Sequence, residues 1–194
     1  MNHPFIDRFV VITGGPGSGK TTLIDALEAT GFARTVEAGR AIIQAELAAG
    51  GTALPWADRE AFAERMLAWE VRSHAAAANR ASAGDGRIYF DRGVPDVIGY
   101  RRLVGLPVPA ALDGAARRLR YHRRVFLAPP WPEIFHADDE RRQDFEEAVR
   151  TADAMRTVYG DYGYEVVELP RATVAERLAF VLAEGRHSTG LDRS

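Results

Sequence analysis

Residues 14–22 read Gly14-Gly15-Pro16-Gly17-Ser18-Gly19-Lys20-Thr21-Thr22, which matches the pattern G-x-x-x-x-G-K-[ST] of a phosphate-binding P-loop. Its glycines let backbone N–H groups converge on phosphate oxygens, and a helix that begins after the loop adds its dipole. The run therefore predicts a binding site for a nucleoside triphosphate. The residues expected to bind it are Gly15, Gly17, Ser18, Gly19, Lys20, Thr21 and Thr22.

Of the 25 lysines and arginines in the chain, only Lys20 is a lysine. An ammonium on a flexible stem reaches over a tight loop and meets the β and γ phosphates as a point charge. A guanidinium is bulkier and points its donors in a fixed fork. The next residue, Thr21, supplies a hydroxyl that is expected to ligate Mg²⁺. ATP with Mg²⁺ is thus the expected ligand pair, with Lys20 also a catalytic candidate.

The residues on either side of the loop agree with a P-loop. Residues 9–13 (Phe-Val-Val-Ile-Thr) predict a buried strand, and residues 22–29 predict a helix with Gly31 just beyond its end. A strand, a glycine loop and a helix in this order are the context that the motif requires.

Length and composition predict one domain. The chain has 194 residues, 46% of them hydrophobic, which is enough for a single well-buried core. We expect a P-loop domain over residues 1–185. Residues 186–194 are polar and are expected to form a disordered tail.

Several classes of partner are disfavoured. The net charge of −2 argues against nucleic acid as the main partner, and the lack of cysteine excludes disulfides and cysteine–zinc sites. The N-terminus does not resemble a signal peptide, and no apolar run approaches the roughly 18 residues of a membrane span. A cytoplasmic protein is therefore expected. The oligomeric state, a homodimer included, stays open.

Four further strands follow the first in the predicted order. Their expected ranges are 34–37, 87–91, 124–128 and 164–169. Between them, residues 40–48, 58–82 and the segment around 145–159 show helical patterns, and residues 173–176 (Thr-Val-Ala-Glu) form a capping box for a last helix. Strands that alternate with helices predict an α/β fold in three layers: a five-stranded parallel sheet with helices on both faces.

Ligands of such sheets bind beyond the carboxyl ends of the strands. Asp91 ends an apolar strand in the manner of a Walker B acid, so it is a candidate Mg²⁺ ligand and catalytic residue, although acidic strand ends are also common. Arg92 could bind a phosphate or an anionic substrate, or could form a surface ion pair. Glu37 could act as general base, or could pair with Arg40 at i, i+3.

Residues 131–142 (Trp-Pro-Glu-Ile-Phe-His-Ala-Asp-Asp-Glu-Arg-Arg) follow a strand end and combine aromatic rings with Arg141 and Arg142. This composition suits a lid that closes over phosphates, with both arginines in catalytic roles, or a solvated loop with an Asp–Arg network. His136 alone is expected to be structural. On the long helix, Phe62, Met66 and Trp69 share one face and are expected in the core rather than in a base-stacking site.

Residues 14–22, 91–96, 125–131 and 163–170 resemble a family of small bacterial P-loop proteins that is classified as an AAA-type ATPase domain. The resemblance extends to about Glu184. That family resembles nucleoside and nucleotide kinases, including the nicotinamide riboside kinase domain. By this resemblance, Asp91-Arg92 corresponds to the Asp-Arg or Glu-Arg pair of those kinases.

The resemblance also implies that Arg141 and Arg142 correspond to lid arginines. The expected function is a kinase that transfers the γ-phosphoryl group of ATP to a small nucleoside- or nucleotide-like acceptor. The alternative is a nucleotide-dependent switch or weak ATPase that acts on a protein partner. The usual guanine-specific switch motif, Asn-Lys-x-Asp, needs a second lysine, which this chain lacks. Residues 40–87 also have room for an acceptor-binding helical layer. Both points favour the kinase. Whether Glu37 or Asp91 takes the proton stays open.

Overall fold

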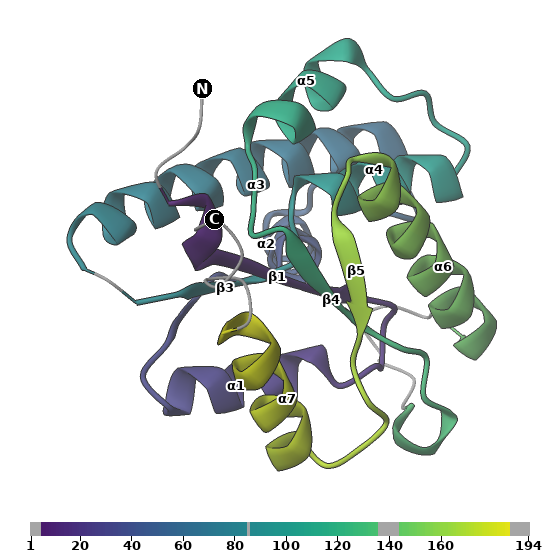
Figure 1. Cartoon of the computed structure of the whole chain (residues 1–194). Coiled ribbons are helices and arrows are strands. Elements are labelled where there is room, and N and C mark those ends of the chain that lie inside the picture. The colour runs from purple at the N-terminus through teal and green to yellow at the C-terminus, as the bar shows by residue number, and fades with distance from the viewer. Residues whose placement is uncertain (1–4, 85, 136–143, 187–194) are drawn as a thin grey trace.

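The protein is built on a five-stranded parallel sheet with the strand order β2-β3-β1-β4-β5 (Figure 1). The computed structural model describes residues 5–84, 86–135 and 144–186. Its strands are β1 (Phe9–Gly14), β2 (Ala33–Arg34), β3 (Ile88–Asp91), β4 (Arg124–Ala128) and β5 (Glu165–Glu168). The predicted α/β fold with a five-stranded parallel sheet is confirmed. Because β1 lies in the centre, the loop that follows it begins in the middle of the carboxyl edge.

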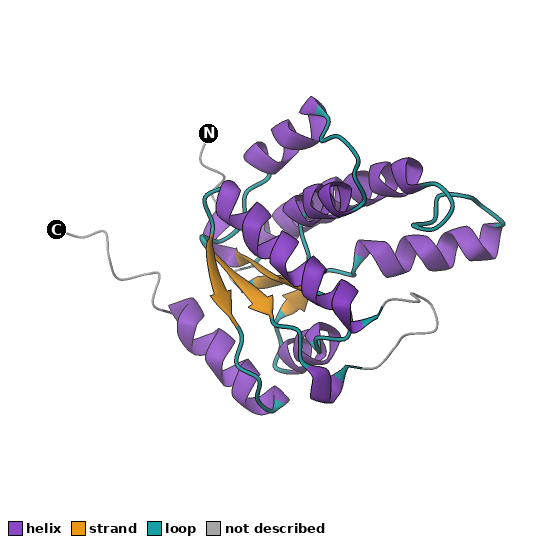
Figure 2. Ribbon diagram, turned by 90° about the vertical axis from the view of Figure 1, so that its right-hand side faces the viewer, coloured by secondary structure: helices purple, strands orange, loops and turns teal. Residues whose placement is uncertain are grey.

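Helices cover both faces of this sheet (Figure 2). They are α1 (Lys20–Ala29), α2 (Ala38–Ala49), α3 (Arg59–Ser82), α4 (Val94–Leu103), α5 (Ala110–Arg118), α6 (Phe145–Asp161) and α7 (Val174–Arg186), with short 3₁₀ helices η1 (Ile6–Arg8) and η2 (Pro132–Ile134). On one face lie α1 and α7, and on the other lie α3, α4 and α6 (Figure 1). No helix in the described ranges combines the length and apolar character needed to cross a membrane.

The alternation of side chains along β1 divides the core between the two faces. Phe9 and Val11 pack with residues of α3 and α6, whereas Val10 and Ile12 pack with residues of α1 and α7. All four side chains are buried, and each such burial contributes about 1.5–3 kcal/mol. A shift of one residue in register would exchange the two sets, so the packing on both faces fixes the position of the loop after β1.

Two helix starts were predictable from their capping residues. Asp58 accepts a hydrogen bond from the Ala61 backbone N–H (3.0 Å) at the start of α3. Before α7, Thr173 and Glu176 bond reciprocally, with the Thr173 backbone N–H donating to the Glu176 carboxylate (2.9 Å). The capping box predicted over residues 173–176 is therefore confirmed.

The second strand is shorter than predicted. The sequence suggested residues 34–37, but β2 ends at Arg34 and Glu37 is the N-cap of α2. The Thr35 backbone N–H still donates to the Tyr89 carbonyl (2.9 Å), and the Thr35 hydroxyl then accepts from the Asp91 N–H (3.1 Å). The Thr35 hydroxyl thus accepts from the Asp91 N–H, which would otherwise donate to a β2 carbonyl and extend the pairing of β2 with β3. The chain then turns into α2.

Other differences from the sequence predictions are small. The last helix before β4, α5, ends at Arg118, a few residues before the strand begins at Arg124. Phe62 and Met66 are buried in the core as predicted, but Trp69 is only partly buried, and its indole N–H donates to the Val36 carbonyl (3.2 Å). The predicted boundary after residue 185 stays a prediction, because residues 187–194 lie outside the described ranges.

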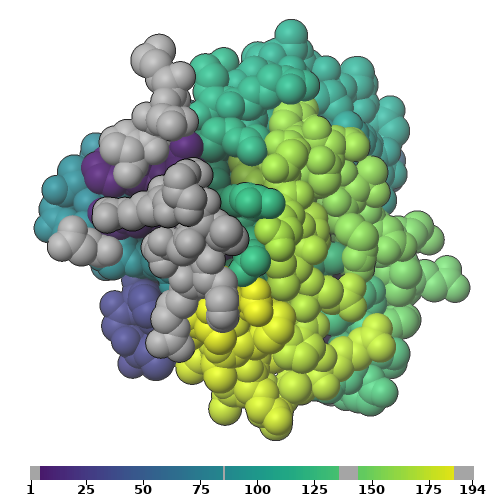
Figure 3. Space-filling model, viewed as in Figure 1, coloured from purple at the N-terminus to yellow at the C-terminus, as the bar shows by residue number. Residues whose placement is uncertain are grey.

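The outer edge of the sheet at β5 carries charged side chains. Glu165 pairs with Arg124 (3.2 Å), and Glu168 pairs with Arg156 of α6 (2.6 Å). Figure 3 shows the surfaces of α6, β5 and α7 side by side on this face of the molecule. Charges along an edge strand disfavour pairing with another sheet, so this edge is a poor place for association through backbone hydrogen bonds.

Candidate functional site

The P-loop is packed too tightly for any residue but glycine at several positions. Gly17 and Gly19 have φ values of 66° and 75°, in the left-handed region. A Cβ at Gly17 would lie 2.5 Å from the Phe135 ring, and one at Gly15 would lie 2.3 Å from the Ala148 carbonyl oxygen of α6. The loop can therefore hold its backbone N–H groups toward a phosphate only with these glycines.

Lys20 is the first residue of α1, and its side chain folds back over the loop. The ammonium donates to the Gly15 carbonyl oxygen (2.5 Å) and to the Ser18 hydroxyl (3.2 Å). The Ser18 hydroxyl in turn donates to Gly15 (2.8 Å). Thr21 and Thr22 are exposed on the first turn of α1. The predicted phosphate-binding residues therefore lie together at the positive end of a helix.

Arg177 of α7 also reaches the P-loop, and sequence reasoning missed it. Its Nη1 donates to the Ser18 carbonyl (3.1 Å), and the side chain is 2% exposed. Its Nε and Nη2 have no hydrogen-bond partner among the described residues, and burial lowers its pKa. A signal was present, because Arg177 interrupts an otherwise apolar stripe formed by Val174, Leu178 and Val181.

Asp91 ends β3 beside β1, in register with Ile12, and is buried. Thr21 lies at the start of the helix that follows β1, so both residues belong to the same edge of the sheet. The described residues include no cluster of three or more His, Cys, Asp or Glu side chains that could hold a metal. One hydroxyl and one carboxylate fit Mg²⁺ all the same, because this ion usually keeps several waters and binds substrate phosphates.

Arg92 lies between two carboxylates. Its Nε is 3.3 Å from Glu37 Oε1, and its Nη1 is 3.2 Å from Asp96 Oδ1. Burial alone would lower the pKa of Arg92, but attraction to Glu37, Asp96 and Asp91 outweighs it and raises the pKa. Its φ of 71° is unusual for a residue with a side chain. Arg92 therefore forms ion pairs, as the alternative prediction held, but these pairs are buried instead of lying at the surface. Both carboxylates line the same cavity.

Asp96 holds this cluster together, although no role was predicted for it from the sequence. It accepts hydrogen bonds from the Thr13 hydroxyl (2.5 Å), the Tyr159 hydroxyl (2.6 Å) and the Gly93 backbone N–H (2.9 Å), besides its ion pair with Arg92. These partners come from β1, α6 and the start of α4. Asp96 therefore fixes where the guanidinium of Arg92 lies.

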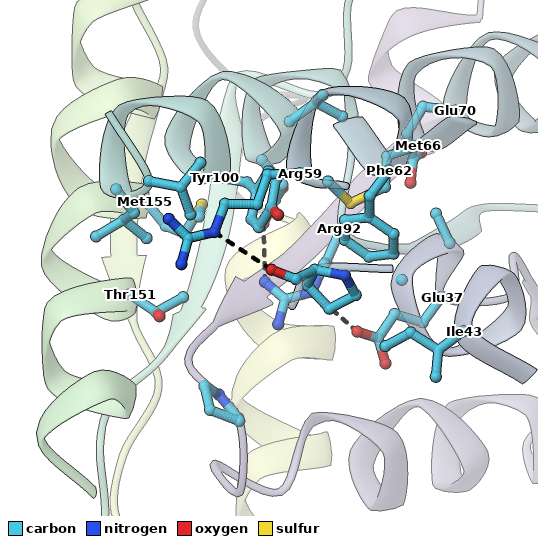
Figure 4. Close-up of a pocket in the computed structure, with 18 of the residues that line it drawn as sticks. Glu37, Ile43, Arg59, Phe62, Met66, Glu70, Arg92, Tyr100, Thr151 and Met155 are labelled. Carbon is cyan, nitrogen blue, oxygen red and sulfur yellow. Dashed lines mark hydrogen bonds and ion pairs between the residues drawn. The ribbon is translucent and has the colours of Figure 1, made fainter. Parts of the chain in front are cut away.

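A cavity of about 350 Å³ opens beside this cluster, between α2, α3, α4, α6 and the P-loop (Figure 4). Its walls are mostly apolar and aromatic, and include Ile43, Trp56, Phe62, Met66, Val97, Tyr100 and Met155. The polar residues that line it include Glu37, Arg59, Glu70, Arg92, Asp96, Glu147 and Thr151, and Pro16 brings the P-loop to its rim. An apolar pocket with a few convergent polar groups is the usual form of a small-molecule site.

Glu70 of α3 is the second residue of this site that the sequence did not suggest. It is 3% exposed and lines the cavity. Burial, followed by repulsion from Asp96 and Asp91, raises the pKa of its carboxyl well above the ordinary glutamate value. Glu70 follows Phe62 and Met66 at intervals of four residues, so it lies on the same helix face as these apolar side chains. An acid on a buried helix face was the feature of the sequence that could have identified it.

Part of the predicted lid contacts the P-loop. The segment that includes η2 brings Ile134 and Phe135 against Gly19 and Gly17, and the Phe135 ring packs edge-on against Phe145 at the start of α6 (5.5 Å between centroids). Arg141, Arg142 and His136 lie outside the described residues. Their predicted roles stay predictions.

Comparison with known proteins agrees with this architecture. A family described as an AAA domain matches residues 9–177, which include the P-loop and the residues that line the cavity. Among curated proteins, no relative matches this sequence.

Several solved structures share the fold. The NadR protein in complex with NR superposes with a TM-score of 0.67 at 19% identity, over 100% of this chain and 53% of that chain. The NadR protein in complex with NAD and AMP-PNP gives 0.64 at 18%, over 100% and 54%. Deoxyadenosine kinase from M. mycoides with bound dATP gives 0.55 at 13%, over 91% and 98%. The chain therefore has the fold of P-loop nucleoside kinases and spans about half the length of the NadR chains.

Proposed function

This chain belongs to the AAA-domain family and has a kinase-like P-loop fold, and from that premise we propose that it transfers the γ-phosphoryl group of ATP to a small nucleoside- or nucleotide-like acceptor. The observation that carries the proposal is the cavity whose lining includes both Pro16 of the P-loop and the Arg92 cluster. A phosphotransferase needs a donor site and an acceptor site that meet at one point. Here the acceptor site would be the cavity.

The P-loop would hold the donor. Its backbone N–H groups and Lys20 would bind the phosphates of ATP, and Arg177 would add positive charge behind the loop. Thr21 and Asp91 would hold Mg²⁺, which when bound neutralises charge on the β and γ phosphates. That similar structures were solved with AMP-PNP and dATP bound supports a nucleotide as the ligand of this chain.

Glu37 is the better candidate for the general base. It lines the cavity where an acceptor hydroxyl would lie, whereas Asp91 would be occupied by the metal. In the proposed step the acceptor oxygen forms a bond to the γ-phosphorus, its proton passes to the Glu37 carboxylate, and the bond from the γ-phosphorus to the bridging oxygen breaks to release ADP. Arg92 would orient Glu37 and stabilise charge on the transferred group.

The first experiment is a thermal-shift screen with ATP–Mg²⁺ and a panel of nucleosides, nucleotides and polyols, followed by an assay of ATP turnover. A kinase should be stabilised by an acceptor and should consume ATP at least about tenfold faster with that acceptor than without it. If no compound raises turnover and slow hydrolysis proceeds alone, the switch or weak-ATPase alternative is favoured. That alternative gives the cavity no role.

Lys20→Ala is the matched variant for this screen. We expect it to lose stabilisation by ATP–Mg²⁺ while it keeps the melting behaviour of the free protein, because the Lys20 ammonium donates to Gly15 and Ser18 of the phosphate-binding loop instead of packing in the core. Equal stabilisation of the variant and the original protein by ATP would contradict the placement of the triphosphate. We further propose that the protein acts in the cytoplasm without nucleic acid, in keeping with its net charge of −2.

A further inference from the structure

Glu70 is a buried acid in the wall of the cavity. It lies on α3 beyond Phe62 and Met66, whose side chains line the same cavity (Figure 4). Its carboxyl group makes no hydrogen bond or ion pair with another residue in the described ranges of the chain. A buried polar group that lacks a partner is costly, and such groups in native structures usually have a function. Glu70 therefore has unused hydrogen-bonding capacity that faces ligand space.

The surroundings of Glu70 favour its neutral form. The titratable groups around Glu70 come from several elements. They are Asp91 at the end of β3, Arg92 after it, Glu37 at the start of α2, Asp96 in α4, and Tyr121 before β4, with His74 one turn further along α3. Arg92 is the cation of this set, and it is already paired with Glu37 and Asp96. Burial and the neighbouring carboxylates raise the pKa of Glu70.

A neutral carboxylic acid presents one O–H donor beside one carbonyl acceptor. The matching ligand edge has an N–H next to a carbonyl oxygen or an unprotonated ring nitrogen. Phe62, Met66 and Tyr100 supply apolar walls around this acid, which suits a flat ring. The cavity volume of about 350 Å³ is within the usual range for small ligands, roughly 300–1,000 Å³.

We propose that Glu70 determines the specificity of the cavity by forming paired hydrogen bonds with the edge of a planar nitrogen heterocycle, a nucleobase of the acceptor. This inference rests on the proposed function for the identity of the ligand as an acceptor. It assigns the base, instead of the sugar, to the α3 wall. A polyol acceptor would offer no such edge and would leave the apolar walls without a partner surface.

The test measures binding and turnover separately. Adenosine, cytidine, uridine and inosine are each compared with the analogue in which methyl groups replace the edge N–H: N6,N6-dimethyladenosine, N4,N4-dimethylcytidine, 3-methyluridine and 1-methylinosine. We expect at least one nucleoside to bind the protein, measured by calorimetry, and its methylated analogue to bind at least about tenfold more weakly.

Two variants identify Glu70 as the residue responsible. Glu70→Gln keeps a donor beside an acceptor and should bind the nucleoside within about threefold of the original protein, whereas Glu70→Leu should lose about tenfold or more. Affinity of the original protein should fall as pH rises through the raised pKa of Glu70, and the Gln variant should show no such fall. Unchanged stabilisation by ATP–Mg²⁺ shows that each variant is folded.

Several outcomes would overturn the inference. They are that no nucleoside of the panel binds, that the methylated analogues bind equally well, or that Gln and Leu lose affinity alike, as expected if Glu70 is the counter-ion of a cationic ligand. The methylated analogues test the inference on the original protein even if the Leu variant does not fold. A nucleoside that binds through Glu70 without being phosphorylated would contradict the kinase proposal alone. Turnover with an unchanged KM for the acceptor in Glu70→Leu would contradict the Glu70 inference alone.

Discussion

Arg177 places a buried positive charge directly behind the P-loop. Its guanidinium donates to the Ser18 carbonyl and is 2% exposed, with two nitrogens that have no hydrogen-bond partner in the described part of the chain. A buried charge without a counter-ion is costly for the free protein. Phosphate groups bound on the other side of the loop would compensate it, so the cost of burial is recovered when the triphosphate binds.

Arg177→Met should therefore separate binding from stability. We expect the affinity for ATP–Mg²⁺ to fall about five- to tenfold, because a charge near the phosphates is lost. We expect the free energy of unfolding to change by less than about 1 kcal/mol, since the loss of one hydrogen bond is offset by the removal of a poorly solvated charge. Calorimetry and urea unfolding measure the two quantities. Arg171→Met, at an exposed arginine before α7, is the control and should change neither.

At the scale of elements, the contact between the P-loop and the segment around η2 ties three parts of the fold together. Phe135 packs on Gly17 of the loop and on Phe145 at the start of α6. The loop also approaches α6 at Gly15, where the nearest atom to an added Cβ is the Ala148 carbonyl oxygen. The shape of the phosphate site therefore depends on β4, η2 and α6, as well as on its own glycines.

Gly17→Ala tests this dependence. The new Cβ would lie 2.5 Å from the Phe135 ring, at a φ of 66° that an alanine rarely adopts. We expect the variant to lose about 1–3 kcal/mol of stability and most of its stabilisation by ATP–Mg²⁺. Thermal unfolding with and without the nucleotide measures both. Gly160→Ala, in α6 with no atom near the added Cβ, is the matched control and should raise stability by about 0.5–1 kcal/mol. An equal gain at Gly17 would show that the loop is not held as described.

The elements that the sequence predicted correctly are those formed by interactions between residues close together in the sequence. The buried runs of β1, β3 and β4 and the caps of α3 and α7 are local, and the predictions for them were right within a few residues. The end of β2 was wrong, because the Thr35 hydroxyl terminates the ladder against Asp91, 56 residues away. A local pattern does not contain such a contact.

The same limit applied to the site. The motif of residues 14–22 and the acid at the end of β3 were found because their spacing is local. The pairing of Arg92 with Glu37, the role of Asp96 as acceptor for Tyr159, and the cavity itself arise from residues that only the fold brings together. Glu70 and Arg177 gave a weaker signal in the sequence, because each is a charged residue in an apolar helical stripe. That signal becomes informative once the burial of the side chain is known.

At the scale of the whole molecule, the neutral form of Glu70 should be visible in the pH dependence of stability. The pKa of Glu70 is raised in the folded protein by burial first and by Asp96 and Asp91 next. Below the ordinary glutamate value, both folded and unfolded chains hold the proton and stability is unaffected. Above that value the unfolded chain releases the proton while the folded chain keeps it, so ionisation favours unfolding and stability falls as pH rises.

Glu70→Gln removes this contribution, because the amide does not titrate. The difference in free energy of unfolding, variant minus original, should therefore increase with pH, by up to about 1.4 kcal/mol per pH unit, until the folded pKa is passed. Urea unfolding from about pH 5 to about pH 8 measures it. Glu64→Gln, the same substitution at an exposed glutamate of the same helix, is the control for effects of the change that do not depend on burial. A difference at Glu70 that stays constant with pH would mean that its carboxyl is ionised in the folded protein. The acid could then donate no hydrogen bond to a nucleobase, and a cationic ligand would become the better partner for the cavity.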